Sequence, residues 1–381
     1  MNINRAKLQY DYVILVLQGG GALGAYQAGV FEGMSEAGYP PDWIIGVSMG
    51  AINGALIAGN PPNQRIERLH AFWDRVSSGI SITAPPFFGA LRQEFTNASA
   101  TLGSVVGVPG FFVPRVPPPA FMPDGAPGAL SVYDVDPLRT TLRRLVDFKL
   151  IKRRKVRLSV GAVNVRTGSS RYFDSLQTRI GPEHVLASGA LPPAFAPVEI
   201  DGEHYWDGGI VSNTPLWYAV DHSPAVNVLI VQVDLFSAEG DLPQNLDQVI
   251  ERHKDIMYSS KARVDTGHVR QIRRLRGALR RLLQKLPLRL RADSDVKTLE
   301  AAGRRGHIDI VHLINRRCGY TGSTKDYEFS RATVEELWAA GLEDARGVVA
   351  HPERLIRTNL SDSVRVYDLM RGPRKKLREA A

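Results

Sequence analysis

Short apolar runs, each followed by a glycine-rich turn and then a helical pattern, organise the first part of the chain. Residues 11–17 and 43–45 are rich in Val, Ile and aromatic or Leu side chains, as in strands that are buried on both faces of a sheet. The segments that follow the two turns, 25–36 and 51–58, have the length and composition of helices. Strand, turn and helix, repeated in this order, predict an α/β fold with a parallel sheet.

Regular patterns return in the second half of the chain. The strands expected there cover residues 155–165, 171–174, 226–233 and 308–314. Beyond Asp234 the pattern changes to long charged helices, among which the strand at 308–314 is the exception. Ser330 is a suitable N-cap for a helix over 330–346, whose apolar residues fall on one face.

The stretch of residues 80–130 lacks a clear period and is rich in Pro, Gly and Phe. A segment of this length without regular structure is usually disordered or functional, as in a lid over an active site. Its aromatic residues, which include Phe87 and Phe88, argue against simple disorder. We therefore expect an apolar cap at residues 80–130, with disorder as the alternative.

The composition is that of a folded protein without disulfides. The chain has 381 residues, of which 44% are hydrophobic and 23% charged, enough to form a core that shields an active site from water. Cys318 is the only cysteine, which fits a reducing compartment. Residues 1–10 contain no apolar signal region, and no run approaches the roughly 18 to 20 apolar residues that span a bilayer. We expect a cytoplasmic protein, with peripheral contact at the inner face of the membrane still open.

The net charge of +9 is concentrated in two basic clusters. Residues 261–291 contain eleven Lys or Arg, and residues 371–378 form the second cluster. Such clusters favour anionic lipids, nucleic acids or acidic partners, or they are simply solvated. Nucleic-acid binding is not expected, because the longer cluster has no interleaved aromatic residues.

Residues 270–286 have the pattern of a basic amphipathic helix that ends before Pro287. Five apolar residues recur at alternating spacings of three and four, namely Ile272, Leu275, Leu279, Leu282 and Leu286. The opposite side carries arginines at 270, 273, 274 and 281. Such a helix can lie on an anionic membrane, form a coiled-coil or dimer contact, or pack on its own domain. The sequence leaves all three alternatives open.

A candidate nucleophile lies in the turn after the second apolar run. Gly46-Val47-Ser48-Met49-Gly50 has the form Gly-x-Ser-x-Gly, whose glycines permit a sharp strand-to-helix turn that exposes the serine hydroxyl. The N-terminus of the following helix favours developing negative charge. The pentapeptide alone is a weak signal, but its place between an apolar strand and a helix of small residues makes Ser48 a candidate nucleophile.

The glycine cluster Gly19 to Gly24 has two interpretations. Glycine-rich backbone at the end of a strand can offer amides to the oxyanion of an acyl-transfer reaction. The same cluster fits the dinucleotide fingerprint Gly-x-Gly-x-x-Gly, which also requires an acidic residue at the end of the second strand. Asp42 stands at about the right distance but precedes that strand, so nucleotide binding is the poorer interpretation.

A nucleophilic serine needs a base. The nearest histidines, His184, His204 and His222, do not lie in the turn after a strand where a hydrolase usually has its base. Trp206-Asp207-Gly208-Gly209 instead places a carboxylate in a turn with two permissive glycines, although this pattern often marks only a turn. The sequence has no Cys-x-x-Cys or His-Glu-x-x-His spacing, so neither a metal nor another cofactor is expected.

Four segments resemble the four successive blocks of the patatin-like phospholipases in both order and spacing. They are GGGALGAYQAGV from Gly19, GVSMGAING from Gly46, ASGALPPAFAPV from Ala187 and YWDGGIVSNTP from Tyr205. Four blocks in register are far more specific than any single motif. The resemblance covers residues 8–235, and the later residues are similar to C-terminal extensions of some bacterial members.

The resemblance implies a three-layer α/β/α fold with a mainly parallel central sheet. Residues 8–235 would be the catalytic domain, and residues 236–381 a helix-rich C-terminal extension of unknown role. It also implies a Ser–Asp dyad without histidine, in which Ser48 is the nucleophile and Asp207 the second member. Glycines would form the oxyanion loop and the supporting turns: Gly19, Gly20 and Gly21 in the former, and Gly46, Gly50, Gly208 and Gly209 in the latter.

The activity that the resemblance implies is hydrolysis of lipid carboxylic esters through an acyl-enzyme, as in a phospholipase A or a lysophospholipase. Two alternatives stay open. The first is an esterase that acts on non-phospholipid esters or a storage polyester. The second is a non-catalytic protein that binds lipid or a partner. An oligomer is compatible with either.

Overall fold

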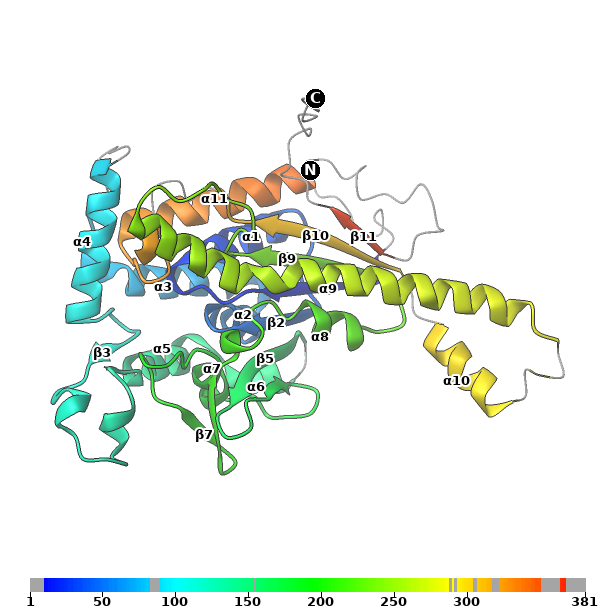
Figure 1. Ribbon diagram of the computed structural model, residues 1–381, viewed down its shortest axis with the longest axis horizontal. Helices are drawn as coiled ribbons and strands as arrows, with labels where there is room; N and C mark the ends of the chain where they lie inside the picture. Colours follow the sequence, from blue (N-terminus) through cyan, green and yellow to red (C-terminus); the bar gives the residue numbers. More distant parts are fainter. Residues whose placement is uncertain are drawn as a thin grey trace.

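The structure is a computed structural model, and it describes residues 10–82, 90–153, 155–287, 290, 293–303, 307–316, 322–350 and 364–367. The strands of its central sheet are β1 (Tyr12–Leu17), β2 (Trp43–Val47), β5 (Arg157–Asn164), β6 (Ser170–Asp174), β7 (Val198–Ile200), β8 (Glu203–Asp207), β9 (Val228–Asp234), β10 (Ile308–Ile314) and β11 (Val364–Tyr367). They follow the order β11-β10-β9-β1-β2-β5-β8-β7, and β6 pairs with β5 off this path (Figure 1). All the strands from β11 to β5 are mutually parallel. β6 and β8 pair antiparallel with β5, and β7 pairs antiparallel with β8. The expected strands are confirmed, with ends shifted by a residue or two.

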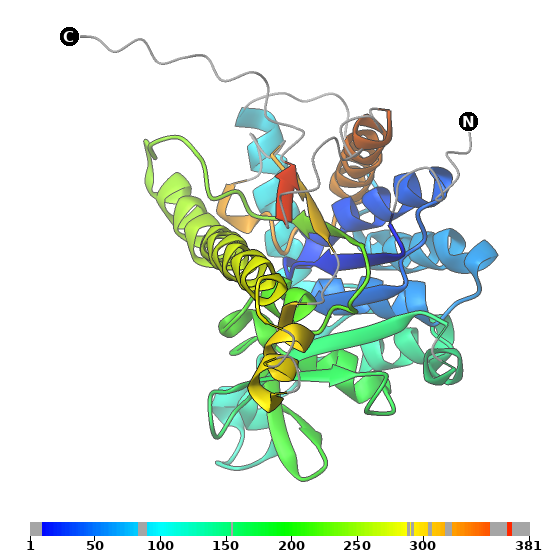
Figure 2. The ribbon, with the colours of Figure 1, turned by 90° about the vertical axis from the view of Figure 1, so that its right-hand side faces the viewer.

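Helices cover both faces of this sheet. They are α1 (Ala25–Glu36), α2 (Met49–Ala58), α3 (Arg65–Val76), α4 (Ala90–Val106), α5 (Asp136–Leu145), α6 (Phe148–Lys152), α7 (Pro182–Ser188), α8 (Leu216–Asp221), α9 (Leu246–Gln284), α10 (Ser294–Gly303) and α11 (Arg331–Val349). In Figure 2 the blue helices α1 to α3 lie on one side of the sheet and the yellow-green α9 on the other. The expected α/β fold with a mainly parallel central sheet is therefore confirmed.

The strand β1 shows why both faces are covered. Its side chains alternate between two cores, with Val13, Leu15 and Leu17 in the larger one and Ile14 and Val16 in the smaller. All five are completely buried, so neither face of the strand meets water. A strand with apolar residues on both sides is stable only between two layers of helices. The uninterrupted apolar run in the sequence thus encodes a central position in the sheet.

The residues after 235 extend the same sheet and the same helical layer. β10 pairs with β9 and β11 with β10, so the expected helix-rich extension also adds two strands to the sheet. α11 packs on α1 at very short range. A Cβ atom on Gly29 would lie 2.0 Å from the carbonyl oxygen of Trp338, and one on Gly341 would lie 2.0 Å from that of Tyr26. Glycine at both positions lets the two backbones touch.

The segment expected to form a cap contains a helix that its sequence pattern did not predict. Residues 83–89 lie outside the described residues, but residues 90–106 form α4. Its inward face is largely polar: Arg92 pairs with Glu336, and Ser99 bonds to Glu328. Valines at 105 and 106 are instead exposed. Because apolar periodicity reveals a helix only when its buried face is apolar, this one was missed.

No helix in the described ranges is long and apolar enough to cross a membrane. The amphipathic segment 270–286 lies in the last part of α9 and continues two residues beyond its end. Cys318 and the basic cluster at residues 371–378, both discussed in the sequence analysis, fall outside the part of the chain that the structure describes.

Candidate active site

The Gly-x-Ser-x-Gly segment forms the sharp turn that its sequence predicts. β2 ends at Val47 and α2 begins at Met49, so Ser48 alone makes the turn, with φ 55° and ψ −124°. A positive φ is uncommon for residues other than glycine, and where it occurs it is often at a functional site. The flanking glycines are sterically required, because a Cβ on Gly46 would lie 2.2 Å from the oxygen of Gly50, and one on Gly50 2.3 Å from that of Leu17.

Asp207 is brought to this turn by strand pairing. It is the last residue of β8, which runs antiparallel to β5 and pairs Asp207 with Ala162. On the same strand, Val47 of β2 pairs with Gly161. Since the two partners are consecutive, β2 and β8 approach each other end to end along β5. The side chains of Ser48 and Asp207 consequently lie next to each other and line the same cavity.

The turn after Asp207 holds the carboxylate in place. The amide of Gly209 donates to its Oδ1 at 2.7 Å. Gly208 must be a glycine, because a Cβ there would lie 2.6 Å from the carbonyl oxygen of Gly161 in β5. The two glycines of the Asp-Gly-Gly sequence therefore have separate tasks: one lets the backbone pass β5 closely, and the other supplies an amide donor.

Burial gives the carboxyl group of Asp207 a pKa close to neutral. The residue is only 2% exposed. Loss of solvation raises the pKa of its carboxyl group to about 7, although the hydrogen bonds from Ser48 and Gly209 oppose this rise by favouring the charged form. A base whose pKa lies close to the working pH combines the correct protonation state with useful basicity. Asp207 thus has the property that the more usual histidine would bring.

A second serine, Ser188 at the end of α7, secures the backbone of the nucleophile. Its hydroxyl accepts the amide of Ser48 at 2.9 Å and donates to the carbonyl of Gly161 at 2.6 Å. The amide of Ser48 is therefore engaged in holding the turn. Ser188 lies in the block from Ala187 that resembles the family, but its specific contact could not be read from the sequence, because the partners are 140 and 27 residues away.

The glycine cluster lies beside Ser48 at the end of β1. The amide of Gly19 donates to the carbonyl of Asn213 at 3.3 Å, and the side-chain amide of Asn213 donates to the carbonyl of Gly19 at 3.0 Å. Gly19 is thus fixed by its own partner. Gly20 and Gly21 line the same cavity as Ser48, and within the described residues their amides have no hydrogen-bond acceptor. Both amides are therefore free to bind an oxyanion.

Gln18, which precedes the cluster, anchors it to the core. It is completely buried, and its side chain donates to Thr214 at 2.8 Å and accepts the amides of Leu235 and Phe236 at 2.5 and 3.1 Å. The sequence analysis did not single it out. A polar residue at the end of an otherwise apolar strand, directly before a glycine turn, is the signal that could have found it.

Ser48 and Asp207 open into an apolar cavity of about 370 Å³. This volume is within the usual range for ligand sites. Eight aromatic residues contribute to its wall: Phe111, Phe112, Tyr133, Phe195, Phe236, Tyr258, Tyr327 and Phe329. The first three belong to the segment after α4, and their rings contact each other and Phe195. The last three come from α9 and from the chain between β10 and α11, so residues on both sides of position 235 build the cavity.

The competing interpretations of the sequence do not fit this geometry. Among the described residues that line the cavity there is no histidine, and His184 instead accepts the amide of Gly181 and packs against Phe173. Asp42 accepts the amide of Val13, so it lies near the start of β1, at the opposite end of the sheet from the glycine cluster. A dinucleotide site needs the acidic residue and the glycine cluster at the same end of the sheet. Within the described ranges no cluster of His, Cys, Asp or Glu could hold a metal.

Comparisons with known proteins point to one family. Residues 15–220, more than half of the chain, match a family model described as patatin-like phospholipase, and residues 256–359 match one described as patatin phospholipase. The chain is 59% identical over 44 residues to lysophospholipase nte1 of Aspergillus terreus. It is 42% identical over 59 residues to the patatin-like phospholipase domain-containing protein ZK370.4 of Caenorhabditis elegans. These alignments cover 12% and 16% of this chain but only 3% and 4% of the two relatives.

Two solved structures are also similar. VipD from Legionella pneumophila aligns over 87% of this chain and 67% of its own, with 15% identity and a TM-score of 0.34. The type III effector protein ExoU aligns over 76% and 61%, with 16% identity and a TM-score of 0.26. At such low scores neither likeness adds weight to the family match.

Proposed function

Because the chain belongs to the patatin-like phospholipase family, we propose that it is a serine acyl-hydrolase that cleaves carboxylic esters of lipids. The observation that carries this proposal is the Ser48 side chain beside the buried Asp207 carboxylate, both facing a cavity with aromatic residues in its wall. Our more specific proposal is a phospholipase A or lysophospholipase type of reaction with a Ser–Asp dyad.

The proposed reaction has two steps. Asp207 accepts the proton of Ser48 as the serine oxygen attacks the ester carbonyl, and the amides of Gly20 and Gly21 donate to the resulting oxyanion. The alcohol leaves with the proton from Asp207, and the acyl group stays on Ser48. A water molecule, deprotonated by Asp207, then attacks the acyl-enzyme and releases the fatty acid. Gly19 supports the loop through Asn213 instead of donating to the oxyanion.

The cavity supports recognition of the acyl chain more directly than of a phosphate. Its only charged lining residues among those described are Asp207 and Asp326, both acidic. No Lys or Arg of the described chain lines it, so a phosphate inside the cavity would have no cationic partner. The aromatic wall instead offers apolar contact to a hydrocarbon chain. This observation favours an esterase for non-phospholipid esters as the alternative function to test.

We also propose that residues 270–286 make the contact with an anionic membrane. In this segment Leu275 and Leu282 are 63% and 60% exposed, which suits insertion at an interface, whereas Leu283 is buried. The test is co-sedimentation with liposomes that contain or lack anionic lipid, comparing the wild type with a Leu275→Ser/Leu282→Ser double variant. Binding that requires neither the leucines nor anionic lipid would contradict the proposal, and a change in oligomeric state of the double variant would favour a coiled-coil contact.

The main experiment is hydrolysis of p-nitrophenyl esters from short to long acyl chains by the wild type, Ser48→Ala and Asp207→Asn. We expect activity in the wild type and its loss in both variants, whose folding is checked by circular dichroism. Wild-type activity in Ser48→Ala would overturn the dyad. A wild type that neither hydrolyses an ester nor reacts with a fluorophosphonate would support the non-catalytic, lipid-binding alternative.

A further inference from the structure

The turn between β10 and α11 touches the glycine loop directly. The carbonyl oxygen of Asp326 accepts the amide of Ala22 at 2.9 Å. A Cβ on Gly21 would lie 1.9 Å from the same oxygen, and Gly21 has a φ of +53°. The Asp326 carbonyl therefore occupies the space that any other residue at position 21 would need. It fixes both the position and the orientation of the loop at this point.

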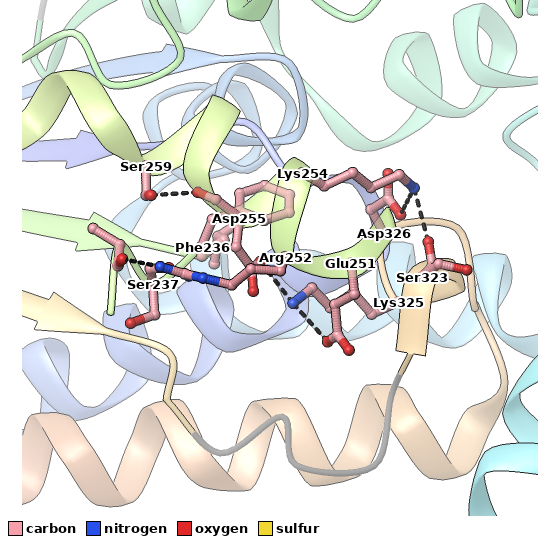
Figure 3. A network of polar contacts seen from close by, with 12 residues as sticks. Phe236, Ser237, Glu251, Arg252, Lys254, Asp255, Ser259, Ser323, Lys325 and Asp326 are labelled. Atoms are coloured by element: carbon pink, nitrogen blue, oxygen red, sulfur yellow. Dashed lines mark hydrogen bonds and ion pairs between the residues drawn. The ribbon is translucent and has the colours of Figure 1, made fainter. Parts of the chain in front are cut away.

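The long helix α9 holds this turn by ion pairs, as Figure 3 shows. The ammonium group of Lys254 lies 2.7 Å from Oδ1 of Asp326 and donates to the carbonyl of Ser323 at 2.8 Å. Lys254 thus binds the turn at two points, the side chain of Asp326 and the backbone of Ser323. Lys254 and Asp326 are both about one-fifth exposed at their side chains, so water screens the pair only in part.

The neighbouring residue of the turn is fastened to the same helix. Lys325 lies 2.9 Å from Glu251 and 2.7 Å from Asp255, and its side chain is 6% exposed. Burial lowers the pKa of this amine, but the carboxylates of Asp255 and Glu251 overcome that effect and raise it above its ordinary value. Lys325 is therefore held as a cation. Three ion pairs therefore join α9 to the turn. In one of them the cation, Lys254, belongs to α9, and in the other two the cation, Lys325, belongs to the turn.

From these contacts we infer that Lys254 is a positioning residue, which acts through Asp326 to hold the Gly20 and Gly21 amides in line for the oxyanion. The inference rests on the proposed function, because it presumes that the glycine loop binds an oxyanion. It assigns a catalytic consequence to the C-terminal part of the chain. Small displacements of a reacting group lower rates strongly, so a loosened loop should affect the transition state far more than substrate binding.

The test compares Lys254→Met, Lys254→Arg and the matched control Arg331→Met. Arg331, at the start of α11, is close in sequence to the turn, but it forms its ion pair with Asp74 of α3. For a p-nitrophenyl ester we expect Lys254→Met to lower kcat roughly 10- to 100-fold with KM changed less than about threefold, because loss of one oxyanion donor costs about 10² to 10³. Lys254→Arg should restore kcat to within about fivefold of the wild type, and Arg331→Met should leave it unchanged.

A second readout separates positioning from general loss of structure. A long-chain alkyl trifluoromethyl ketone, which forms an oxyanion on the serine, should bind Lys254→Met at least about tenfold more weakly, whereas the matching fatty acid should bind equally well. Asp326→Asn serves as the second variant if Lys254→Met does not fold. If Ser48→Ala is inactive, then equal weakening of both ligands, or an unchanged kcat in Lys254→Met, overturns the inference. Activity in Ser48→Ala would instead refute the proposed function itself.

Discussion

Val47 and Asp207 pair with consecutive residues of β5, Gly161 and Ala162, although they lie 160 positions apart in the chain and on strands of opposite direction. This register places Ser48, the residue after Val47, next to the Asp207 carboxylate. A shift of one residue in either strand would turn the side chain to the other face of the sheet. The pairing register of the sheet therefore sets the distance between the two side chains of the proposed dyad, and the two turns orient them.

The raised pKa of Asp207 predicts a pH dependence of activity. Because Asp207 must be ionised to accept the serine proton, kcat/KM should rise as the pH increases through about 7 and then level off. The measurement is a pH profile with a soluble ester between pH 5 and 9. A profile that stays flat across this range would contradict a role for Asp207 as the base.

The same pKa predicts that Asp207 destabilises the folded protein at high pH. Its folded-state pKa lies above the ordinary value of 3.8, so the folded state binds a proton that the unfolded state releases between pH 3.8 and about 7. Burial of the ionised Asp207 carboxylate therefore does not lower the free energy of unfolding below about pH 3.8, and it lowers it fully above about pH 7. Asp207→Asn should therefore raise the free energy of unfolding by about 4 kcal/mol at pH 8 relative to its effect at pH 4. Denaturant unfolding of both proteins at the two pH values checks this, and a pH-independent difference would refute it.

Removal of the Ser188 hydroxyl should loosen the turn at Ser48. Ser188→Ala leaves the Ser48 amide and the Gly161 carbonyl without their partner, which costs about 1 to 3 kcal/mol of stability, and we expect kcat to fall about tenfold. The control is Ser77→Ala, a buried serine that bonds to the Trp73 carbonyl and does not line the cavity. It should lose stability but keep kcat. Equal kinetics in the two variants would show that Ser188 is only structural.

Filling the cavity should shift the preferred acyl length. Ala194 lines the cavity beside Phe195, and Ala194→Phe would place a further ring in a space of about 370 Å³. We expect kcat/KM for long-chain esters to fall at least about tenfold relative to short-chain esters, since differential apolar contact of a few methylenes is worth this much. Ala120→Phe, at an exposed position of the segment after α4, is the control. An unchanged ratio in Ala194→Phe would mean that the acyl chain binds elsewhere.

The contact between α1 and α11 predicts opposite effects for two glycine substitutions in one helix. Gly341→Ala would put a Cβ 2.0 Å from the Tyr26 carbonyl and should destabilise the protein by about 2 kcal/mol or more. At Gly347 nothing lies within 4 Å of the added Cβ, so Gly347→Ala should stabilise by about 0.5 to 1 kcal/mol through helix propensity. Thermal unfolding of both variants decides the matter. Equal effects would mean that α11 does not pack on α1 as described.

Local patterns predicted a large share of the fold. Strands such as β1 and β2 are recognisable because complete burial requires an unbroken apolar run, which is visible without knowledge of the neighbours. The N-cap of α11 is equally local, since the Ser330 hydroxyl accepts the amide of Thr333. The helix α4 was missed for the converse reason. It is buried through polar contacts such as Arg92 with Glu336, and polar contacts leave no apolar period in the sequence.

The sequence by itself determined the parts of the candidate site that depend on neighbours along the chain. The turn at Ser48 and the close passage at Gly208 follow from glycines at fixed offsets, because only residues without a Cβ fit there. Tertiary structure alone decided which groups meet across the sheet: the pairing of Asp207 with Ser48, the support of Ser48 by Ser188, and the grip of Lys254 on the turn beside the glycine loop. These partners lie from 72 to more than 100 residues apart. A charge or hydroxyl in the sequence does not identify its partner, because hydrogen bonds and ion pairs depend on distances that the folded sheet and helices set.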